Sequence, residues 1–257
     1  FSIIISIMKI KAIIFDFGFT LFYFDNPSVE RYNECFKKGL LKSIETLKEK
    51  QVWSEHLSDE SFIEKFFKKR NECFRESFKT KTEFSTSKIY HDVLESLDEV
   101  NLDDDTYEKL AEIYHSYEGK EWKPFPTTKE TLDKLSKYED LKLAVLSNHP
   151  NHKMVENSLK EYDLFSYFDV IVTSDEFGRR KPDPNIFLYT LDKLGLRDQT
   201  DSVIMCGDDY ADIIGAQRAN LQSVLVERKY KFPYERELNI SNLRRIDNIS
   251  EILNFIE

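Results

Sequence analysis

The apolar positions of this chain follow two different periods. Residues 12–15, with the sequence AIIF, are continuously apolar, which predicts a strand buried on both faces of a parallel sheet. Between residues 24 and 121, apolar side chains instead recur every three or four positions, as they do on amphipathic helices. After Trp122 the chain returns to short apolar runs that alternate with helical spacing, a pattern typical of a doubly wound α/β sheet.

These two periods predict that one domain is inserted into another. We expect an α/β core with a doubly wound, Rossmann-like parallel sheet, formed by residues 1–23 and 122–257. The intervening residues 24–121 are expected to form a four-helix bundle. The later strands are expected at Leu141–Leu146, Phe168–Thr173, Val203–Cys206 and Ser223–Val226, and the tail from Ile249 to Ile256 has helical spacing.

Local signals place the four helices of the inserted segment. The first is predicted to start at Pro27, because proline is favoured in a first helical turn, and the second follows the acidic start SDES. The third opens at Ser85 or Ser87, and the fourth ends at Gly119. We interpret the phenylalanine stripe of the second helix as bundle core rather than as a substrate site; it comprises Phe62, Phe66, Phe74 and Phe78.

Composition narrows the class of protein. The 257 residues carry a formal net charge of -10, which argues against nucleic-acid and membrane partners. The three cysteines are widely spaced and form no CxxC motif, so a reducing cytoplasm is expected. The apolar segment FSIIISIM is too short to span a bilayer, and we interpret residues 1–7 as an extension ahead of a natural start at Met8. We expect a cytoplasmic monomer or homodimer.

Polar side chains follow four of the predicted strands. Asp16 follows the first strand, Ser147 and Asn148 the second, Lys181 lies beyond the third, and three aspartates follow the fourth: Asp208, Asp209 and Asp212. Ligands bind at the carboxyl ends of parallel strands, so these groups are expected to share one cleft. Carboxylates bind Mg²⁺ as hard oxygen ligands, usually with water and phosphate completing the octahedron. The pattern therefore predicts a Mg²⁺ site that receives a phosphate group.

These residues resemble the motifs of the haloacid dehalogenase-like superfamily of phosphohydrolases. The first motif of that family, Asp-x-Asp-x-Thr, is similar to the segment from Asp16 to Thr20, DFGFT. The second is matched by Ser147, the third by Lys181 in KPDP, and the fourth by GDDYAD, residues 207–212. All four occur in the family's order, and the helical insertion lies where the family has a helical cap. The resemblance extends over nearly the whole chain from Lys9.

The resemblance implies a role for each matched residue. Asp16 would attack phosphorus and form an aspartyl-phosphate, splitting one displacement into two. Ser147 and Lys181 would contact the phosphoryl group, and Thr20 would brace the nucleophile loop. Substrate-binding positions would be Phe17, Gly18, Ser147, Asn148 and Lys181. Mg²⁺ would be held by Asp16, the Gly18 carbonyl and Asp208, with Asp209 or Asp212 orienting metal-bound water. The substrate would be a small phosphorylated metabolite.

One position departs from the family pattern. The usual second aspartate of the first motif, which protonates the leaving oxygen, is Gly18 here. Acid and base assistance is worth about 10²–10⁴-fold in rate, so its loss matters. Three interpretations are open: another residue or water supplies the proton, the substrate has a good leaving group, or most catalysis has been lost.

Two other functions are considered beside a phosphatase. The first is a 2-haloacid dehalogenase, whose second motif resembles Ser147 and Asn148. Those enzymes need no metal, whereas Asp208, Asp209 and Asp212 would then repel Asp16 without a cation between them. The second is a catalytically impaired member that binds a phosphorylated metabolite or a protein.

The sequence assigns no function to the histidines. The resemblance gives no role to His149 and His152, which follow the second motif. His56, His91 and His115 lie in the inserted segment without the spacing of metal ligands.

Overall fold

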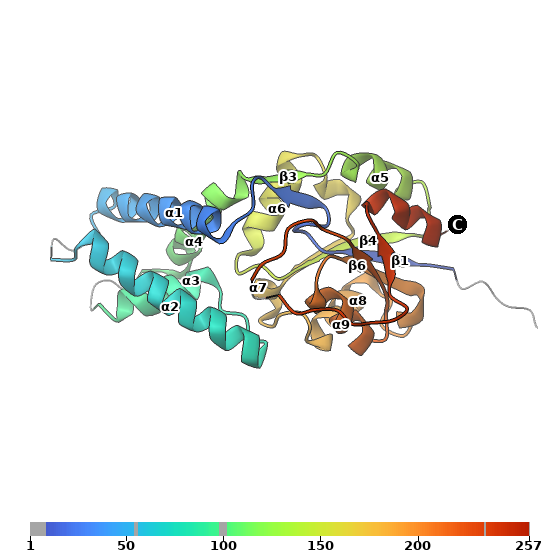
Figure 1. The fold of residues 1–257 in the computed structure, drawn as a ribbon. Helices are drawn as coiled ribbons and strands as arrows, with labels where there is room; N and C mark the ends of the chain where they lie inside the picture. The colour runs from blue at the N-terminus through green and yellow to red at the C-terminus, as the bar shows by residue number, and fades with distance from the viewer. Residues whose placement is uncertain (1–8, 54–55, 98–101, 234, 257) are drawn as a thin grey trace, which may run out of the picture.

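A six-stranded parallel sheet forms the centre of the core domain (Figure 1). The computed structural model describes residues 9–53, 56–97, 102–233 and 235–256, so the predicted start at Met8 lies outside the described residues. The strand order β5-β4-β1-β6-β7-β8 places β1 between β4 and β6, and all neighbouring strands run parallel. The strands are β1 (Ala12–Phe15), β4 (Lys142–Ser147), β5 (Val170–Thr173), β6 (Val203–Gly207), β7 (Gln222–Val226) and β8 (Arg244–Ile246). The predicted α/β fold is thereby confirmed.

Strand β1 is apolar throughout because both faces of the sheet are covered. Ile13 and Phe15 belong to one buried apolar cluster, together with residues of α5 (Thr128–Leu135), α6 (His152–Glu161) and the 3₁₀ helix η3 (Ile249–Phe255). Ala12 and Ile14 belong to a second cluster with α8 (Pro184–Leu194) and α9 (Tyr210–Arg218). Successive side chains of a strand point to opposite faces, so an uninterrupted apolar run fills both clusters.

Short elements complete the core domain. They are the helix α7 (Ser174–Phe177), the 3₁₀ helices η1 (Phe165–Tyr167) and η2 (Thr200–Ser202), and an antiparallel ribbon of β2 (Phe22–Phe24) and β3 (Trp122–Pro124). The sequence pattern predicted neither this ribbon nor α5 and β8. The tail, expected to be helical, is 3₁₀ rather than α-helical.

Four long helices lie between β2 and β3 in the chain, on one side of the core (Figure 1). They are α1 (Val29–Glu49), α2 (Asp59–Thr80), α3 (Thr86–Glu95) and α4 (Asp104–Gly119), and they share one buried apolar cluster. The predicted start at Pro27 is wrong by two residues, because the Ser28 side chain caps α1 by accepting a hydrogen bond from the Arg31 amide. The division of the chain at residues 24 and 121 stays a prediction.

The interpretation of the phenylalanine stripe on α2 is wrong for half of its members. Phe62 and Phe66 are fully buried in the helical cluster, as expected. Phe78 is 41% exposed, and Phe74 is only partly buried. Both line the cavity between the helices and the core domain. The stripe therefore continues from the buried cluster of the four helices to the wall of the cavity.

Two predictions from composition concern disulfide bonds and membrane-spanning segments. Cys35, Cys73 and Cys206 are buried and unpaired, so none of them belongs to a disulfide. Within the described ranges, every helix is too short or too polar to cross a lipid bilayer.

Candidate active site

Lys181 joins the carboxyl ends of three strands. Its ammonium group lies 2.5 Å from Oδ1 of Asp16, 2.6 Å from Oδ1 of Asp212 and 2.7 Å from the carbonyl oxygen of Leu146. All three N–H groups of the ammonium are therefore used, and the side chain is buried. Burial alone would lower the pKa of Lys181, but Asp16 and Asp212 outweigh it and hold the pKa well above its ordinary value. Lys181 is a permanent cation beside Asp16.

The loop after β4 holds Lys181 in place. The Asn148 side-chain amide donates to the Lys181 carbonyl oxygen at 3.1 Å, and its oxygen accepts from the Lys181 backbone N–H at 2.8 Å. Because both polar atoms of this side chain are occupied, Asn148 positions the lysine loop. Ser147, the last residue of β4, is buried and lines the same cavity as Asp16. The structure thus brings the second and third motifs together at one sheet edge.

Asp208 follows β6 and contacts a hydroxyl group and a guanidinium group. Thr20 donates its hydroxyl proton to Oδ1 of Asp208 at 3.4 Å, and the Arg228 guanidinium lies 2.9 Å from Oδ2. Arg228 also pairs with Glu235 at 2.6 Å and lies over the ring of Phe19. Burial opposes the charge of Arg228, but Asp208 and Glu235 keep its pKa above the ordinary value. Nothing in the sequence signalled Arg228, which comes after the last predicted strand.

Asp209 and Asp212 form the start of α9. Oδ1 of Asp209 accepts from the amides of Ala211 and Asp212, and Oδ2 of Asp212 accepts from the amides of Asp208 and Asp209. This is a capping box, so both residues are tied to the helix terminus. Gly207 permits the arrangement, because a Cβ there would lie 2.3 Å from Cγ of Asp212.

The carboxylate cluster has the chemistry of a cation site. Ligand atoms of Asp16, Asp208 and Asp212 all lie within 4.8 Å of one another. Burial raises the pKa of Asp208 well above its ordinary value, since Arg228 only partly opposes the desolvation and the neighbouring carboxylates add to it. Burial raises the pKa of Asp212 in the same way, against the opposing effect of Lys181. A divalent cation would relieve both costs, so the residues present fit the metal that the sequence implied.

Gly18 lies under the indole of Trp122. A Cβ at position 18 would lie 2.8 Å from Cη2 of Trp122, closer than real contacts allow. The indole is fixed in place by edge contacts with Phe17, Phe19 and Phe24 and by a hydrogen bond. Phe17 itself is buried and stacked on the ring of Phe22, and it also lines the cavity; its predicted contact with a substrate stays a prediction.

The comparisons with known proteins agree with this geometry. A family model described as haloacid dehalogenase-like hydrolase matches residues 13–226. The chain belongs to this family. The match includes the end of β1, the Lys181 loop and the start of α9.

Several relatives of this haloacid dehalogenase-like protein carry phosphatase names. A phosphoglycolate phosphatase of Aquifex aeolicus is 40% identical over 106 residues, which are 40% of this chain and 46% of that protein. A glyceraldehyde 3-phosphate phosphatase of Methanothermobacter thermautotrophicus is 33% identical over 143 residues, covering 54% of this chain and 61% of that protein. The matches to these curated relatives therefore span only about half of their length.

Solved structures share the fold over almost the whole chain. A 2-haloacid dehalogenase from Pseudomonas syringae superposes with a TM-score of 0.63 at 21% identity, covering 96% of this chain and 98% of that one. A haloacid dehalogenase-family phosphatase from Thermococcus onnurineus gives a TM-score of 0.56 at 23% identity, covering 96% and 97%. At these identities the likeness concerns the fold, which is common to a dehalogenase and a phosphatase.

A second buried cluster of titratable groups links the helices to the core of this family member. Nδ1 of His115 lies 2.7 Å from Oε2 of Glu118, and Nε2 of His149 lies 3.4 Å from Oε1. His115 and Glu118 are one turn apart on α4, and His149 comes from the loop after β4. Burial raises the pKa of Glu118, but His149 and His115 more than reverse this and hold the pKa below its ordinary value. The sequence did not signal this cluster, because one of its members is distant in the chain.

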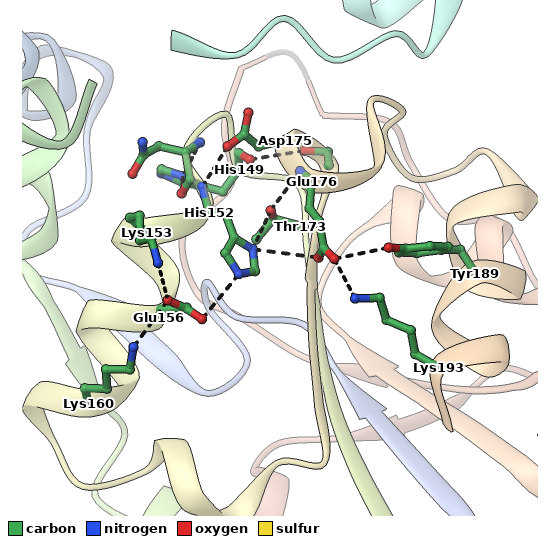
Figure 2. Close-up of polar contacts among 12 residues, drawn as sticks. His149, His152, Lys153, Glu156, Lys160, Thr173, Asp175, Glu176, Tyr189 and Lys193 are labelled. Atoms are coloured by element: carbon green, nitrogen blue, oxygen red, sulfur yellow. Dashed lines mark hydrogen bonds and ion pairs between the residues drawn. The ribbon is translucent and has the colours of Figure 1, made fainter. Parts of the chain in front are cut away.

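His152 does not line the cavity and takes part in a polar network beside it. Figure 2 shows its imidazole between Glu156 and Glu176, with Nδ1 at 3.0 Å from the Thr173 hydroxyl. The His152 amide donates to Asp175 at 2.9 Å. This network joins α6 to β5 and α7, so His152 has a structural role at the loop.

Proposed function

We propose that this protein is a Mg²⁺-dependent phosphatase that hydrolyses a small phosphomonoester through an aspartyl-phosphate on Asp16. The observation that carries the proposal is the contact between Asp16 and Lys181 at the floor of a cavity of about 530 Å³. Lys181 engages Oδ1 of Asp16, which leaves Oδ2 as the oxygen for attack on phosphorus. The phosphatase names among the relatives support the same reaction class.

The residues around Asp16 suit phosphoryl transfer because they provide position and positive charge. Lys181 would neutralise the attacking carboxylate and an equatorial phosphoryl oxygen, and the Ser147 hydroxyl would donate to another. Asn148 would keep Lys181 in register through its two hydrogen bonds to the lysine backbone. Arg228 lines the same cavity and could supply a further positive charge.

Asp16, Asp208 and the Gly18 carbonyl are the groups proposed to hold Mg²⁺, which binds oxygen ligands and neutralises phosphoryl charge when present. Asp212 uses both of its oxygens on protein donors, so it would act by holding Lys181 and the Asp208 backbone. Asp209 keeps one oxygen outside the helix cap and could orient metal-bound water.

Turnover of a panel of phosphomonoesters, measured with and without Mg²⁺, tests the proposal. Asp16→Asn should abolish phosphate release while the variant keeps the circular dichroism spectrum and melting temperature of a folded protein. The matched control is Asp140→Asn, an exposed aspartate outside the cavity, which should retain full activity. Substantial phosphate release by Asp16→Asn would refute the assignment. Chloride release from 2-chloropropionate without metal would instead favour a dehalogenase, and metabolite binding without turnover would favour an impaired member.

A further inference from the structure

The surface beside Asp16 carries no acid at position 18. Gly18 has no side chain, and the Trp122 indole covers the place where one would extend. The indole is held by Phe17, Phe19 and Phe24, so it does not move aside without disrupting an aromatic cluster. A leaving oxygen on this side of the site would meet an apolar ring.

The N–H groups of Lys181 and the ring nitrogens of His149 face protein acceptors rather than the space above Asp16. Each N–H of Lys181 is used by a protein acceptor. In His149, Nδ1 lies 2.9 Å from the carbonyl oxygen of Asn151, and Nε2 faces Glu118. Neither ring nitrogen of His149 is therefore directed at Asp16. Asp208 and Asp209 also line the cavity, but the proposed function assigns the first to Mg²⁺ and the second to metal-bound water. Among the described residues that contact Asp16 or adjoin it in sequence, no side chain offers a proton to a departing oxygen.

Aromatic rings from both sides form part of the cavity wall, between charged side chains such as Lys81, Arg180 and Arg236. From the helices come Phe36, Phe74, Phe78 and Tyr114, and from the core domain come Phe19 and Trp122. The Arg70 guanidinium lies 4.4 Å from the centre of the Phe36 ring and lines the same cavity. The Tyr114 hydroxyl is buried in this wall with no hydrogen-bond partner among the described residues. A planar ring with a polar substituent would match this lining.

We propose that the substrate is the phosphomonoester of a planar aromatic alcohol, whose oxygen leaves without being protonated by the enzyme. This inference rests on the proposed phosphatase function and names the substrate class of the same site. Asp16 forms a bond to phosphorus while the bond from phosphorus to the aryl oxygen breaks, and the electron pair leaves with an aryloxide that takes its proton from solvent. Water then attacks phosphorus, Asp16 leaves as a carboxylate, and both water protons depart with the phosphate.

The missing acid at Gly18 and the aromatic rings in the cavity wall argue against different classes of substrate. An alkyl phosphate such as phosphoglycolate releases a strongly basic alkoxide, which needs the missing acid. A nucleoside 5′-monophosphate has a suitable ring but also releases an alkoxide. An acyl phosphate has a good leaving group but no ring for the aromatic wall. An aryl phosphate satisfies both the missing acid at Gly18 and the aromatic wall.

The first experiment measures kcat/KM for a series of substituted phenyl phosphates against the pKa of the released phenol. We expect a steep fall as the phenol becomes more basic, and turnover of phosphoglycolate at least about 10²-fold slower than phenyl phosphate. Adenosine 5′-monophosphate should show a similar KM to phenyl phosphate with a much lower kcat. A flat dependence with equal turnover of phosphoglycolate would overturn the inference and leave the phosphatase function standing. Hydrolysis of none of these esters would overturn both.

Variants separate the missing acid from the aromatic wall. Gly18→Asp combined with Trp122→Leu should flatten the dependence on phenol pKa relative to Trp122→Leu alone, because the smaller side chain admits the carboxylate. Phe78→Ala should raise KM for phenyl phosphate several-fold while KM for acetyl phosphate stays constant. Its matched control is Phe165→Ala, since Phe165 is 37% exposed and lies outside the cavity. Equal KM values for phenyl phosphate in the Phe78→Ala and Phe165→Ala variants would contradict the aromatic wall.

Discussion

Replacement of Glu118 by glutamine tests how the helical segment is fixed to the core. Glu118 is buried. Its carboxylate lies 2.7 Å from Nδ1 of His115 and 3.4 Å from Nε2 of His149, and it accepts a hydrogen bond from the Trp122 indole N–H at 3.4 Å. Glu118→Gln keeps the shape of the side chain and removes its charge. Removing one partner of a buried ion pair costs about 3–5 kcal/mol, and the glutamine oxygen can still accept one hydrogen bond, so we expect about 3 kcal/mol. For a chain of this size that lowers Tm by roughly 6–12 °C.

The loss should depend on pH in a defined direction. Burial lowers the pKa of His149, but Glu118 reverses this and leaves the pKa above 6.5, so the stabilisation from His149 is present below 6.5 and is lost as pH rises through its folded pKa. Glu118 has a folded pKa below 4.5, so its contribution is present above 4.5 and is lost as pH falls. Burial lowers the pKa of His115 to about 4, so His115 stays neutral in the window between.

Thermal unfolding at pH 6 and pH 9 provides the measurement. Wild type and Glu118→Gln should differ most near pH 6, and the difference should shrink at pH 9. Glu130→Gln is the matched control, because Glu130 is an exposed helix residue paired with Lys134, and its substitution should leave the melting temperature essentially unchanged. A Glu118→Gln protein that melts within about 2 °C of wild type at pH 6 would refute the reasoning about this cluster.

Three further predictions concern close contacts and the carboxylate cluster. Gly207→Ala should displace Asp212, lowering kcat at least tenfold and the free energy of unfolding by about 1–3 kcal/mol, as enzyme assays and urea titration would show. Gly39→Ala places a Cβ 2.0 Å from the Tyr114 carbonyl oxygen, so α1 and α4 should separate and urea titration should show a loss of about 2–3 kcal/mol in the free energy of unfolding. Excess Mg²⁺ should raise Tm, and more so at pH 8 than at pH 5, because protons compete for carboxyls whose pKa is raised; Asp208→Asn should abolish this shift.

The sequence predicted the strands that deliver the site because their signals are local. The apolar run 12–15 could only be buried on both faces, and three of the four later strands were followed by polar residues that the parallel sheet brings to one edge. Helix starts could also be predicted where a capping side chain stands at the terminus, as at Ser58 and Ser85. The helix start predicted at Pro27 was wrong because the adjacent Ser28 side chain caps the helix.

The rest depends on contacts between distant segments. Helical spacing places Phe78 and Phe62 on one face of α2. The spacing does not show how far along this face the neighbouring helices extend, so the exposure of Phe78 could not be predicted. Arg228 follows the last predicted strand without any motif, and its contact with Asp208 arises only from the neighbouring positions of β6 and β7. The cover of Gly18 by Trp122 required the β2–β3 ribbon, whose three-residue strands are too short to show a period.

The three contacts of Lys181 have a consequence for the synthesis of the protein. The lysine lies 165 residues after Asp16 in the chain, and its other carboxylate partner, Asp212, is made later still. A nascent chain that has not yet released Asp212 from the ribosome has β1 and β4 but lacks β6, so the lysine has an incomplete set of acceptors. The proposed nucleophile Asp16 would therefore gain its full set of contacts only when almost the entire core has emerged, and a truncated product would be inert.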